Sequence, residues 1–478
     1  MEPSKPSRRR SRRHSATRHR GTLAWLGLLY LAFVIYGSLV PLDFHPLPWG
    51  VAVAKFREIP FLDLGIGSRA DWVANLLLFI PLAFFWTGAL AHGRHPVLAA
   101  VLTLFTFLAA AALSVGIEFT QEFFPQRTVS QNDIAAETLG ALVGAACWWG
   151  YGARLLAWYE GWKSEREPAG LAERAAWGYF VALIAYGVLP LDLTISAVEI
   201  YHKWHEGKVI LVPFAGLPAD PARALYQVIT DILLWVPLAW LWRARPGRDF
   251  TRVLRMTLLT AVSLEFMQLF VYSRVTDVTE IFNAGLGAAL GAWLGGRQFG
   301  SARRVVASHT SRSATSVGLR LLLALAWLPV LLLVFWYPFD FRSDSAFVHE
   351  RMDFLNRVPF QVYYFGTEFR AVTEVFHKTL FFAPLGALLA WWVSGLSWHW
   401  RGYAAALSLL ACIAAALGIE LGQVFLPGKF PDTTDWFLES TGGLLGYVFT
   451  RMLLRRLAPN PARQVPPRRQ GSSRKPSL

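Results

Sequence analysis

The sequence predicts an all-α integral membrane protein: a polytopic helix bundle with about 12 transmembrane helices in three tandem four-helix repeats. Composition, the length of the apolar runs and internal repetition each indicate this class. Of the 478 residues, 54% are hydrophobic and only 16% are charged. Such a chain is too apolar for an ordinary soluble protein.

Apolar runs long enough to cross a bilayer recur along the chain. A helix rises about 1.5 Å per residue, so roughly 20 apolar residues span the hydrocarbon core. Twelve spans are predicted, at 22–40, 72–91, 97–122, 133–153, 175–190, 225–242, 253–272, 279–296, 319–337, 373–393, 402–424 and 435–453. The fifth is short by this count, which fits a helix that is less tilted or begins earlier.

One polar motif occurs three times and divides these spans into groups of four. A glutamate is followed by glutamine at +3, a cation at +9 and a second carboxylate at +15. The copies are Glu118, Gln121, Arg127 and Asp133; Glu265, Gln268, Arg274 and Glu280; and Glu420, Gln423, Lys429 and Asp435. Self-similarity of this kind predicts three structural repeats, at 22–160, 172–300 and 317–456.

Each repeat follows the same plan. The first span ends at a proline, because proline lacks an N–H and restricts the residue before it. An outside loop of about 30 residues follows, a length that is often functional. The second span carries a polar residue six positions before a proline, the third ends in the Glu-x-x-Gln pair, and the fourth opens with the second carboxylate. Two glycines four residues apart in the fourth span predict close approach of a neighbouring helix.

The charge distribution predicts the orientation. The net charge is +14, and 32 of the 46 Lys and Arg residues fall in the tails and loops assigned to one side, with only six of the 32 acids. Lys and Arg in short loops stay cytoplasmic. We therefore expect a bacterial inner membrane protein with both termini cytoplasmic. The basic charge is then a topology signal, and no nucleic-acid partner is expected. Residues 1–21 and 457–478 are predicted to be disordered basic tails.

The motif residues are predicted to converge near the outer ends of the spans. Glu118 lies late in the third span and Asp133 opens the fourth, with Asn75 early in the second. Ionisable residues within a span favour a functional site. The alternative is a structural clamp, in which Glu118 bonds the turn backbone or pairs with Arg127. The candidate binding residues are Asn75, Glu118, Gln121, Arg127, Asp133, Asp231, Glu265, Gln268, Arg274, Asp277, Glu280, Glu420, Gln423, Lys429, Asp432 and Asp435.

The three copies differ at informative positions. Ser130 stands where the other repeats have Asp277 and Asp432. The polar residue of the second span changes from Asn75 to Asp231 and then to Lys378, which could pair with Glu374 four residues earlier. Repeats one and two are therefore the expected sites of activity.

The combined pattern resembles the VanZ-like membrane family. The resemblance covers residues 22–456, and the departures from the family pattern include Ser130, Asp231, Lys378, Lys429 and Glu280. The family's namesake is an accessory factor in low-level teicoplanin resistance, so the resemblance implies work at the cell envelope and a link to antibiotic resistance.

Three functions are consistent with these patterns. In the first, the outer sites bind a membrane lipid or a lipid-linked envelope precursor, with Arg127 and Arg274 facing its phosphate or carboxylate. In the second, the protein is an intramembrane enzyme, with Glu118 or Glu265 as general base and Asp133 or Glu280 as partner. A transporter ranks below both, because the polar residues gather toward one side of the membrane.

No metal or cofactor is predicted. A histidine-rich loop segment, Glu199, His202, His205 and Glu206, could be read as metal ligands, but its histidines are three residues apart rather than four. A solvated interfacial helix is the preferred interpretation. The two cysteines, Cys147 and Cys412, lie in separate repeats and support neither a disulfide nor a metal set. Oligomeric state and the arrangement of the repeats about an axis are not determined by these patterns.

Overall fold

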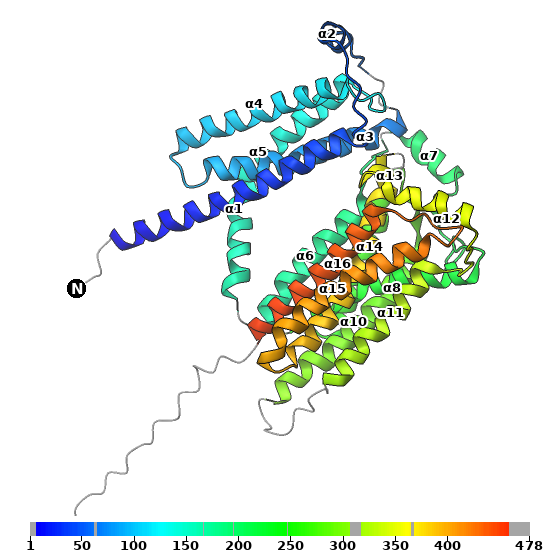
Figure 1. The fold of residues 1–478 in the computed structure, drawn as a ribbon. Helices are drawn as coiled ribbons and strands as arrows, with labels where there is room; N and C mark the ends of the chain where they lie inside the picture. The colour runs from blue at the N-terminus through cyan, green and yellow to red at the C-terminus, as the bar shows by residue number, and fades with distance from the viewer. Residues whose placement is uncertain are drawn as a thin grey trace, which may run out of the picture.

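The computed structural model describes residues 6–61, 65–165, 167–194, 196–245, 247–305, 317–364 and 368–457. Over these ranges the chain is almost entirely helical (Figure 1). Twelve of its helices are 19 to 34 residues long. They form three consecutive four-helix units.

The units have the same element order. Unit 1 contains α1 (Pro6–Leu39), α2 (Trp49–Arg57), α3 (Ile66–Ala91), α4 (Pro96–Gln121) and α5 (Gln131–Ser164). Unit 2 contains α6 (Pro168–Val188), α7 (Ala197–His205), β1 (Val209–Ile210), α8 (Pro221–Arg243), α9 (Phe250–Gln268), β2 (Thr276–Asp277) and α10 (Val278–Val305). Unit 3 contains α11 (Val317–Trp336), α12 (Ser345–Met352), η1 (Asp353–Asn356), α13 (Gln361–Tyr364), α14 (Glu368–Ser394), α15 (Trp398–Gln423) and α16 (Thr433–Leu457).

Six segments of these helices are long and apolar enough to cross a membrane. They are Thr17–Leu39, Ser68–Ala91, Pro96–Gln121, Arg223–Arg243, Val317–Trp336 and Trp398–Gln423. The structure is thus that of a predominantly helical protein with six candidate membrane spans, and the predicted count of about 12 is not reached on this criterion. Several of the other long helices carry the motif's acids, such as Glu280 in α10 and Asp435 in α16, and this lowers their hydropathy.

The second and fourth long helices of each unit pack backbone to backbone. A Cβ atom on Gly140 of α5 would collide with the Leu76 carbonyl oxygen of α3. The corresponding glycines are Gly287, against the Ile232 carbonyl, and Gly442, against the Thr379 carbonyl. Only glycine permits this approach, which sets the polar start of the fourth helix beside the polar residue of the second.

The chain just after the first long helix has the same backbone conformation in all three units. A cis peptide bond precedes Pro41, Pro190 and Pro338, and the next residue has a φ of 65–66° in each case. The chain then runs along the end of the third long helix. The N–H groups of His45, Thr194 and Arg342 donate to the carbonyls of Phe123, Phe270 and Phe425, at 2.8, 2.9 and 2.7 Å respectively.

The N-terminal segment differs from the predicted disordered tail. From Pro6 onward it is helical and continuous with the first span as α1. Arginine has a high helix propensity, and His19 lies 2.8 Å from Glu160 of α5, which fastens the basic segment to its own unit. The predicted C-terminal tail at 457–478 lies outside the described residues beyond Leu457, the last residue of α16.

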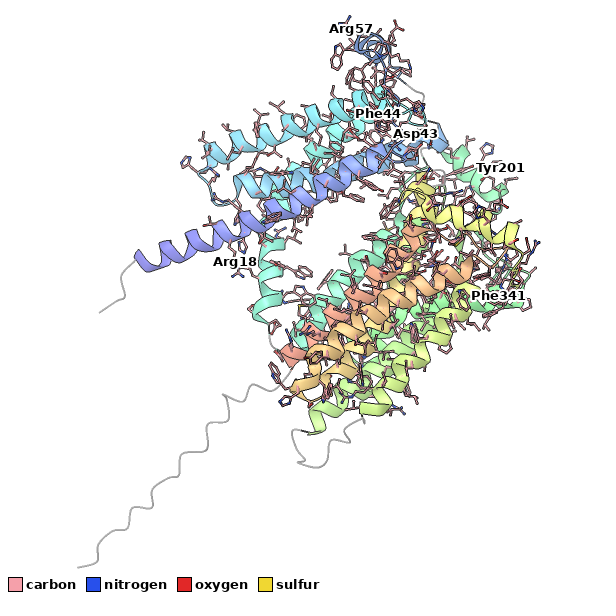
Figure 2. The ribbon with its side chains drawn as sticks, in the orientation of Figure 1. Arg18, Asp43, Phe44, Arg57, Tyr201 and Phe341 are labelled. Atoms are coloured by element: carbon pink, nitrogen blue, oxygen red, sulfur yellow. The ribbon has the colours of Figure 1, made fainter. Side chains whose placement is uncertain are left out.

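The predicted outside loops also contain structure, since each carries at least one short helix: α2, α7 or α12. Figure 2 shows Asp43, Phe44, Tyr201 and Phe341 at the end of the molecule where these short helices lie, with Arg18 at the far end of unit 1. We call the end with the short helices the outer end. Figure 1 shows unit 1 meeting the other two units there and α1, α3 and α4 diverging from them toward the opposite end, where the last turns of α5 return to them and Trp162 contacts Phe449 of α16.

Candidate functional site

The first glutamate of each motif makes the same hydrogen bond. Oε2 of Glu118 accepts from the backbone N–H of Ser130 at 3.1 Å, and Oε2 of Glu265 accepts from that of Asp277 at 3.0 Å. Oε2 of Glu420 accepts from the N–H of Asp432 at 2.9 Å. All three glutamates are buried, with at most 6% of the residue exposed. Each ties the end of the third long helix to the start of the fourth, as the clamp interpretation expects.

The glutamine at +3 connects the third helix to the first. Nε2 of Gln121 donates to the Ser38 carbonyl at 2.7 Å, and Nε2 of Gln268 donates to the equivalent Gly187 carbonyl at 3.1 Å. Unit 3 differs, because Nε2 of Gln423 donates to Oε1 of Glu420 at 3.0 Å. The predicted amide position is therefore a link between helices in units 1 and 2.

The cation at +9 reaches the residue before the cis-proline. Nη1 of Arg127 donates to the Val40 carbonyl at 3.4 Å, and Nε of Arg274 donates to the Leu189 carbonyl at 2.9 Å. Burial lowers the pKa of Arg274, which also lies over the ring of Tyr186. In unit 3 burial is the largest cause that lowers the pKa of Lys429, followed by repulsion from Arg223. The two arginines thus hold the C-terminus of the first helix as well as bordering the acids.

The second acid meets the polar residue of the second helix in units 1 and 3. Nδ2 of Asn75 donates to Oδ1 of Asp133 at 2.6 Å. Nζ of Lys378 forms a close ion pair with Asp435 and lies 3.6 Å from Glu374. The predicted pairing of Lys378 with Glu374 therefore exists, but Lys378 also neutralises the motif's own acid.

Unit 2 has a different arrangement. Asp231 accepts from Nδ2 of Asn283 at 3.3 Å, while the Glu280 carboxyl lies within hydrogen-bonding reach of Glu265. The site of unit 2 therefore contains two adjacent glutamates.

The residue at +12 caps the fourth helix. Oδ1 of Asp277 accepts from the N–H of Thr279 at 2.7 Å, and Oδ1 of Asp432 accepts from that of Thr434 at 2.6 Å. In unit 1 the Ser130 hydroxyl accepts from the N–H of Asp133 at 3.2 Å. Serine and aspartate are both strong N-cap residues, so the difference at this position preserves a structural role.

Two buried cations near this site were not predicted. Nζ of Lys203, from α7, donates to the Val271 carbonyl at 2.7 Å and also to the Gln268 carbonyl. Arg351, from α12, donates to the carbonyls of Leu426 and Pro427. Both cap the C-terminus of the third long helix of their unit. They lie at different distances along the chain from their glutamates, so no fixed spacing marks them in the sequence.

Exposure differs within the unit 1 site. Glu118 is 2% exposed, whereas Asn75, Arg127 and Asp133 are half-buried. A further buried acid, Glu137, lies one turn beyond Asp133 and is 2% exposed. Carboxyl groups therefore outnumber the one motif cation, and the accessible residues are Asn75, Arg127 and Asp133.

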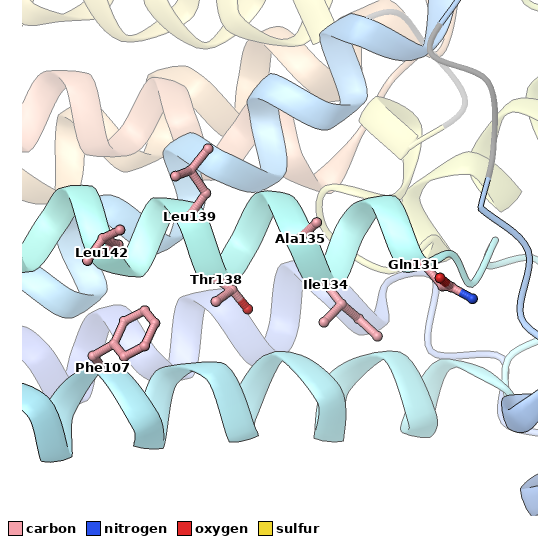
Figure 3. A pocket seen from close by; sticks show the side chains of 7 residues that line it. All are labelled: Phe107, Gln131, Ile134, Ala135, Thr138, Leu139 and Leu142. Atoms are coloured by element: carbon pink, nitrogen blue, oxygen red, sulfur yellow. The ribbon is translucent and has the colours of Figure 1, made fainter.

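A groove of about 500 Å³ runs between α4 and α5 (Figure 3), and neither Asn75 nor Asp133 is among its lining residues. Its lining is apolar apart from Gln131 and Thr138, and Gln131 lies at one end, two residues before Asp133. The groove is lined by Phe107, Gln131, Ile134, Ala135, Thr138, Leu139 and Leu142.

The histidine-rich loop segment takes another role. Glu199 of α7 accepts two hydrogen bonds from the Arg69 guanidinium, at 2.7 and 3.0 Å. Within the described ranges, no group of three or more His, Cys, Asp and Glu side chains is placed to hold a metal ion.

Comparison with known protein families identifies the repeated unit. A family model described as VanZ/LLP1 matches residues 11–156, 176–296 and 321–455. The chain belongs to this VanZ-like family. It contains three tandem VanZ-like units, and each match includes one complete copy of the polar motif. Comparisons with curated proteins and with solved structures find no match.

Proposed function

We propose that this VanZ-like protein binds the headgroup of an envelope lipid or lipid-linked precursor at the outer ends of units 1 and 2. In this role it is an accessory protein of the cell envelope, with glycopeptide resistance as the physiological setting that the family suggests. The proposal includes twelve membrane crossings, placement in the bacterial inner membrane and cytoplasmic termini.

The Asn75–Asp133 pair, two residues along α5 from the Gln131 end of the α4–α5 groove, is the observation that carries this proposal. The pair is half-buried and polar, and the groove on the α4 side of the same helix is mostly apolar and about 500 Å³ in volume. A lipid has the same division, because its headgroup needs hydrogen-bond partners and its chain needs apolar contact. Arg127, also half-buried, adds a guanidinium suited to phosphate or carboxylate.

The differences between the units favour units 1 and 2. In unit 3 the Lys378–Asp435 ion pair occupies the position of the Asn75–Asp133 pair, and Asp435 is only 6% exposed. Lys378 thus neutralises the second acid of the motif in unit 3. In unit 2 the half-buried Asp231 and Glu280 leave carboxyl groups in excess of Arg274.

The proposal is tested by the lipid that co-purifies with the full-length protein, identified by mass spectrometry. We expect the Arg127→Ala, Arg274→Ala double variant to lose one specific anionic lipid that the wild type retains. Lys429→Ala, at the same motif position in unit 3, is the matched control and should retain that lipid.

A second variant separates binding from folding, because Arg127 and Arg274 also hold backbone carbonyls. Asp133→Asn keeps the shape of the side chain but removes a negative charge that would repel an anionic headgroup, so it should raise retention of that lipid without lowering the melting temperature by more than the control does. An unchanged lipid profile in both variants would contradict the proposal.

An enzymatic role is the alternative, and the excess of carboxyl groups over cations favours it. Glu118 with Asp133, or Glu265 with Glu280, would supply a base and its partner. Incubation of the purified protein with lipid-linked precursors should then yield a new product. Full turnover by a Glu118→Gln, Glu265→Gln double variant would exclude these glutamates as the base.

A further inference from the structure

The end of unit 3 that is opposite the outer end contains a basic pocket, which is separate from the polar motif. It has a volume of about 730 Å³ and lies between the end of α14, the start of α15 and the last turns of α16. The lining residues are Ala390, Val393, Ser394, Trp398, His399, Arg401, Gly402, Tyr447, Arg451, Leu454 and Arg455. Three arginines, a histidine and a tyrosine thus share one cavity with apolar side chains.

The arginines of this pocket have no acid near them in sequence. Residues 317–339, 386–418 and 440–478 contain no Asp or Glu, and these segments include the inner halves of α11, α14, α15 and α16. Arg401 is held in place, since its Nε donates to the Leu396 carbonyl at 2.8 Å and its Nη2 to the Ser394 carbonyl at 3.1 Å. Its positive charge is positioned at the pocket but not neutralised by these carbonyls.

One face of α16 presents three of the polar groups. Tyr447, Arg451 and Arg455 follow one another at intervals of four residues, so they lie along one stripe of the helix. Tyr447 is 1% exposed, and within the described part of the chain its hydroxyl has no hydrogen-bond partner. A buried hydroxyl without a partner costs free energy, so a ligand that accepts a hydrogen bond from it is favoured.

The Tyr447–Arg451 pair of this pocket has no counterpart at the equivalent positions of units 1 and 2. The positions of Tyr447 and Arg451 correspond to Ala145 and Trp149 in unit 1, and to Ala292 and Gly296 in unit 2. In unit 1 the ring of Trp148 occupies the space beside Gly88 and Gly152. The basic stripe is therefore not required by the fold of a unit.

We propose that this pocket binds the phosphate of an anionic phospholipid headgroup. Arginine forks suit phosphate oxygens, and the Tyr447 hydroxyl would donate the remaining hydrogen bond. Ala390, Val393 and Leu454 offer apolar contact to the start of the acyl chains. Trp398 is 82% exposed at the rim, a placement typical of the bilayer interface. Basic pockets between membrane helices bind such headgroups.

The test uses the full-length protein in nanodiscs of phosphatidylcholine, with and without phosphatidylglycerol. Native mass spectrometry should show phosphatidylglycerol retained by the wild type. In Arg451→Gln, Arg455→Gln, retention should require at least about tenfold more of that lipid, because the loss of even one charge-assisted hydrogen bond has that effect. Arg154→Gln, near the corresponding end of α5 in unit 1, is the matched control and should behave as wild type.

Tyr447→Phe distinguishes binding from packing. It removes only an unpartnered hydroxyl, so its melting temperature in phosphatidylcholine alone should equal or exceed that of the wild type. Its retention of phosphatidylglycerol should fall severalfold. Equal retention by all variants would overturn the proposal. Inorganic phosphate that stabilises the protein in phosphatidylcholine as strongly as phosphatidylglycerol does would overturn the lipid as the source of the phosphate.

Discussion

A buried lysine, Lys203, determines how α7 is attached to unit 2. Lys203 is 0% exposed, and its Nζ donates hydrogen bonds to carbonyls at the C-terminus of α9. The last carbonyls of a helix have no partners within the helix and carry partial negative charge, so a cation there is stabilising. Lys203 therefore joins the outer helix to the third long helix, directly above the Glu265 site.

We expect Lys203→Met to lower the free energy of unfolding by roughly 1–3 kcal/mol, because it removes the Nζ hydrogen bonds to the Gln268 and Val271 carbonyls and leaves each with one backbone donor. Thermal denaturation of the purified protein, followed by the loss of soluble monomer, measures the change. His202→Met replaces the exposed neighbour on the same helix and should have little effect. Equal melting temperatures for the two variants would contradict the role assigned to Lys203.

The same lysine predicts a pH dependence. Burial lowers the pKa of Lys203 to about 8, from an ordinary value of 10.5. Between these values the unfolded chain binds more protons than the folded chain at this position, so this residue's contribution to stability rises as pH increases from about 8 to about 10.5.

This contribution should be absent from Lys203→Met. Comparing the melting temperature of the wild type and the variant from pH 8 to pH 10 isolates it. Tyr272, whose pKa is raised to about 12 mainly by its hydrogen bond to Glu206, acts in the opposite direction but only above its ordinary pKa of 10. A difference between wild type and variant that is constant over this range would refute the lowered pKa.

At the scale of elements, the contact between the second and fourth long helices sets the geometry of each site. Gly140 lies against the carbonyl of Leu76, the residue next to Asn75. Asn75 reaches Asp133 because these two backbones approach so closely. The glycine positions are therefore part of the site, although glycine has no side chain to contribute.

Gly140→Val should push α3 away from α5 and lower the free energy of unfolding by about 1–3 kcal/mol, the usual effect of overpacking. Gly150→Val is the matched control in the same helix, because no other atom lies within 4 Å of a Cβ placed there. Both variants place the same valine in the same helix, so its intrinsic helix propensity acts on both. The difference in melting temperature between them therefore measures the effect of the contact between α3 and α5 at position 140. Similar melting temperatures would show that the helices do not meet at Gly140.

At the scale of the whole molecule, the outer ends of the units are joined by specific contacts. The Arg69–Glu199 ion pair connects α3 of unit 1 to α7 of unit 2, and both side chains are 15% exposed. Tyr36 of unit 1 donates to the Pro359 carbonyl of unit 3 at 2.8 Å. Tyr337 of unit 3 donates to Asp220 of unit 2 at 3.4 Å. Each pair of units therefore shares a polar contact near the motif end.

Reversing one charge of the Arg69–Glu199 pair should weaken the junction between units 1 and 2. We expect Arg69→Glu and Glu199→Arg each to lower the melting temperature, and the double variant to recover part of the loss. Pairs in direct contact commonly show coupling of about 0.5–3 kcal/mol in such a cycle. Additive losses in the double variant would show that the two side chains are not in contact.

The orientation of the whole bundle is also testable. Single cysteines at positions 127, 274 and 429, in a background without Cys147 and Cys412, should react with a membrane-impermeant thiol reagent added to intact cells whose outer membrane has been permeabilised. A cysteine at Arg94, in the short turn between α3 and α4, should react only after the inner membrane is opened. The reverse pattern would invert the proposed topology.

The sequence by itself determined the helical class, the presence of three units and which residues make up each copy of the motif. These follow from apolar run length and from the fixed spacing between Glu118, Arg127 and Asp133, which are local properties of the chain. The ends of the third helices at Gln121, Gln268 and Gln423 were likewise predictable, since a polar pair closes each apolar run.

Only the tertiary structure decided which groups satisfy one another. Lys378 could pair with Glu374 along its own helix, but its partner in α16 depends on how α14 and α16 cross. Lys203 and Arg351 became visible as helix caps only once α7 and α12 were folded back onto α9 and the end of α15. Within a helix, the spacing of two residues along the chain determines whether they can contact each other. Between helices, contact depends on how the helices pack, and the loops that join them differ in length, so no fixed spacing predicts it.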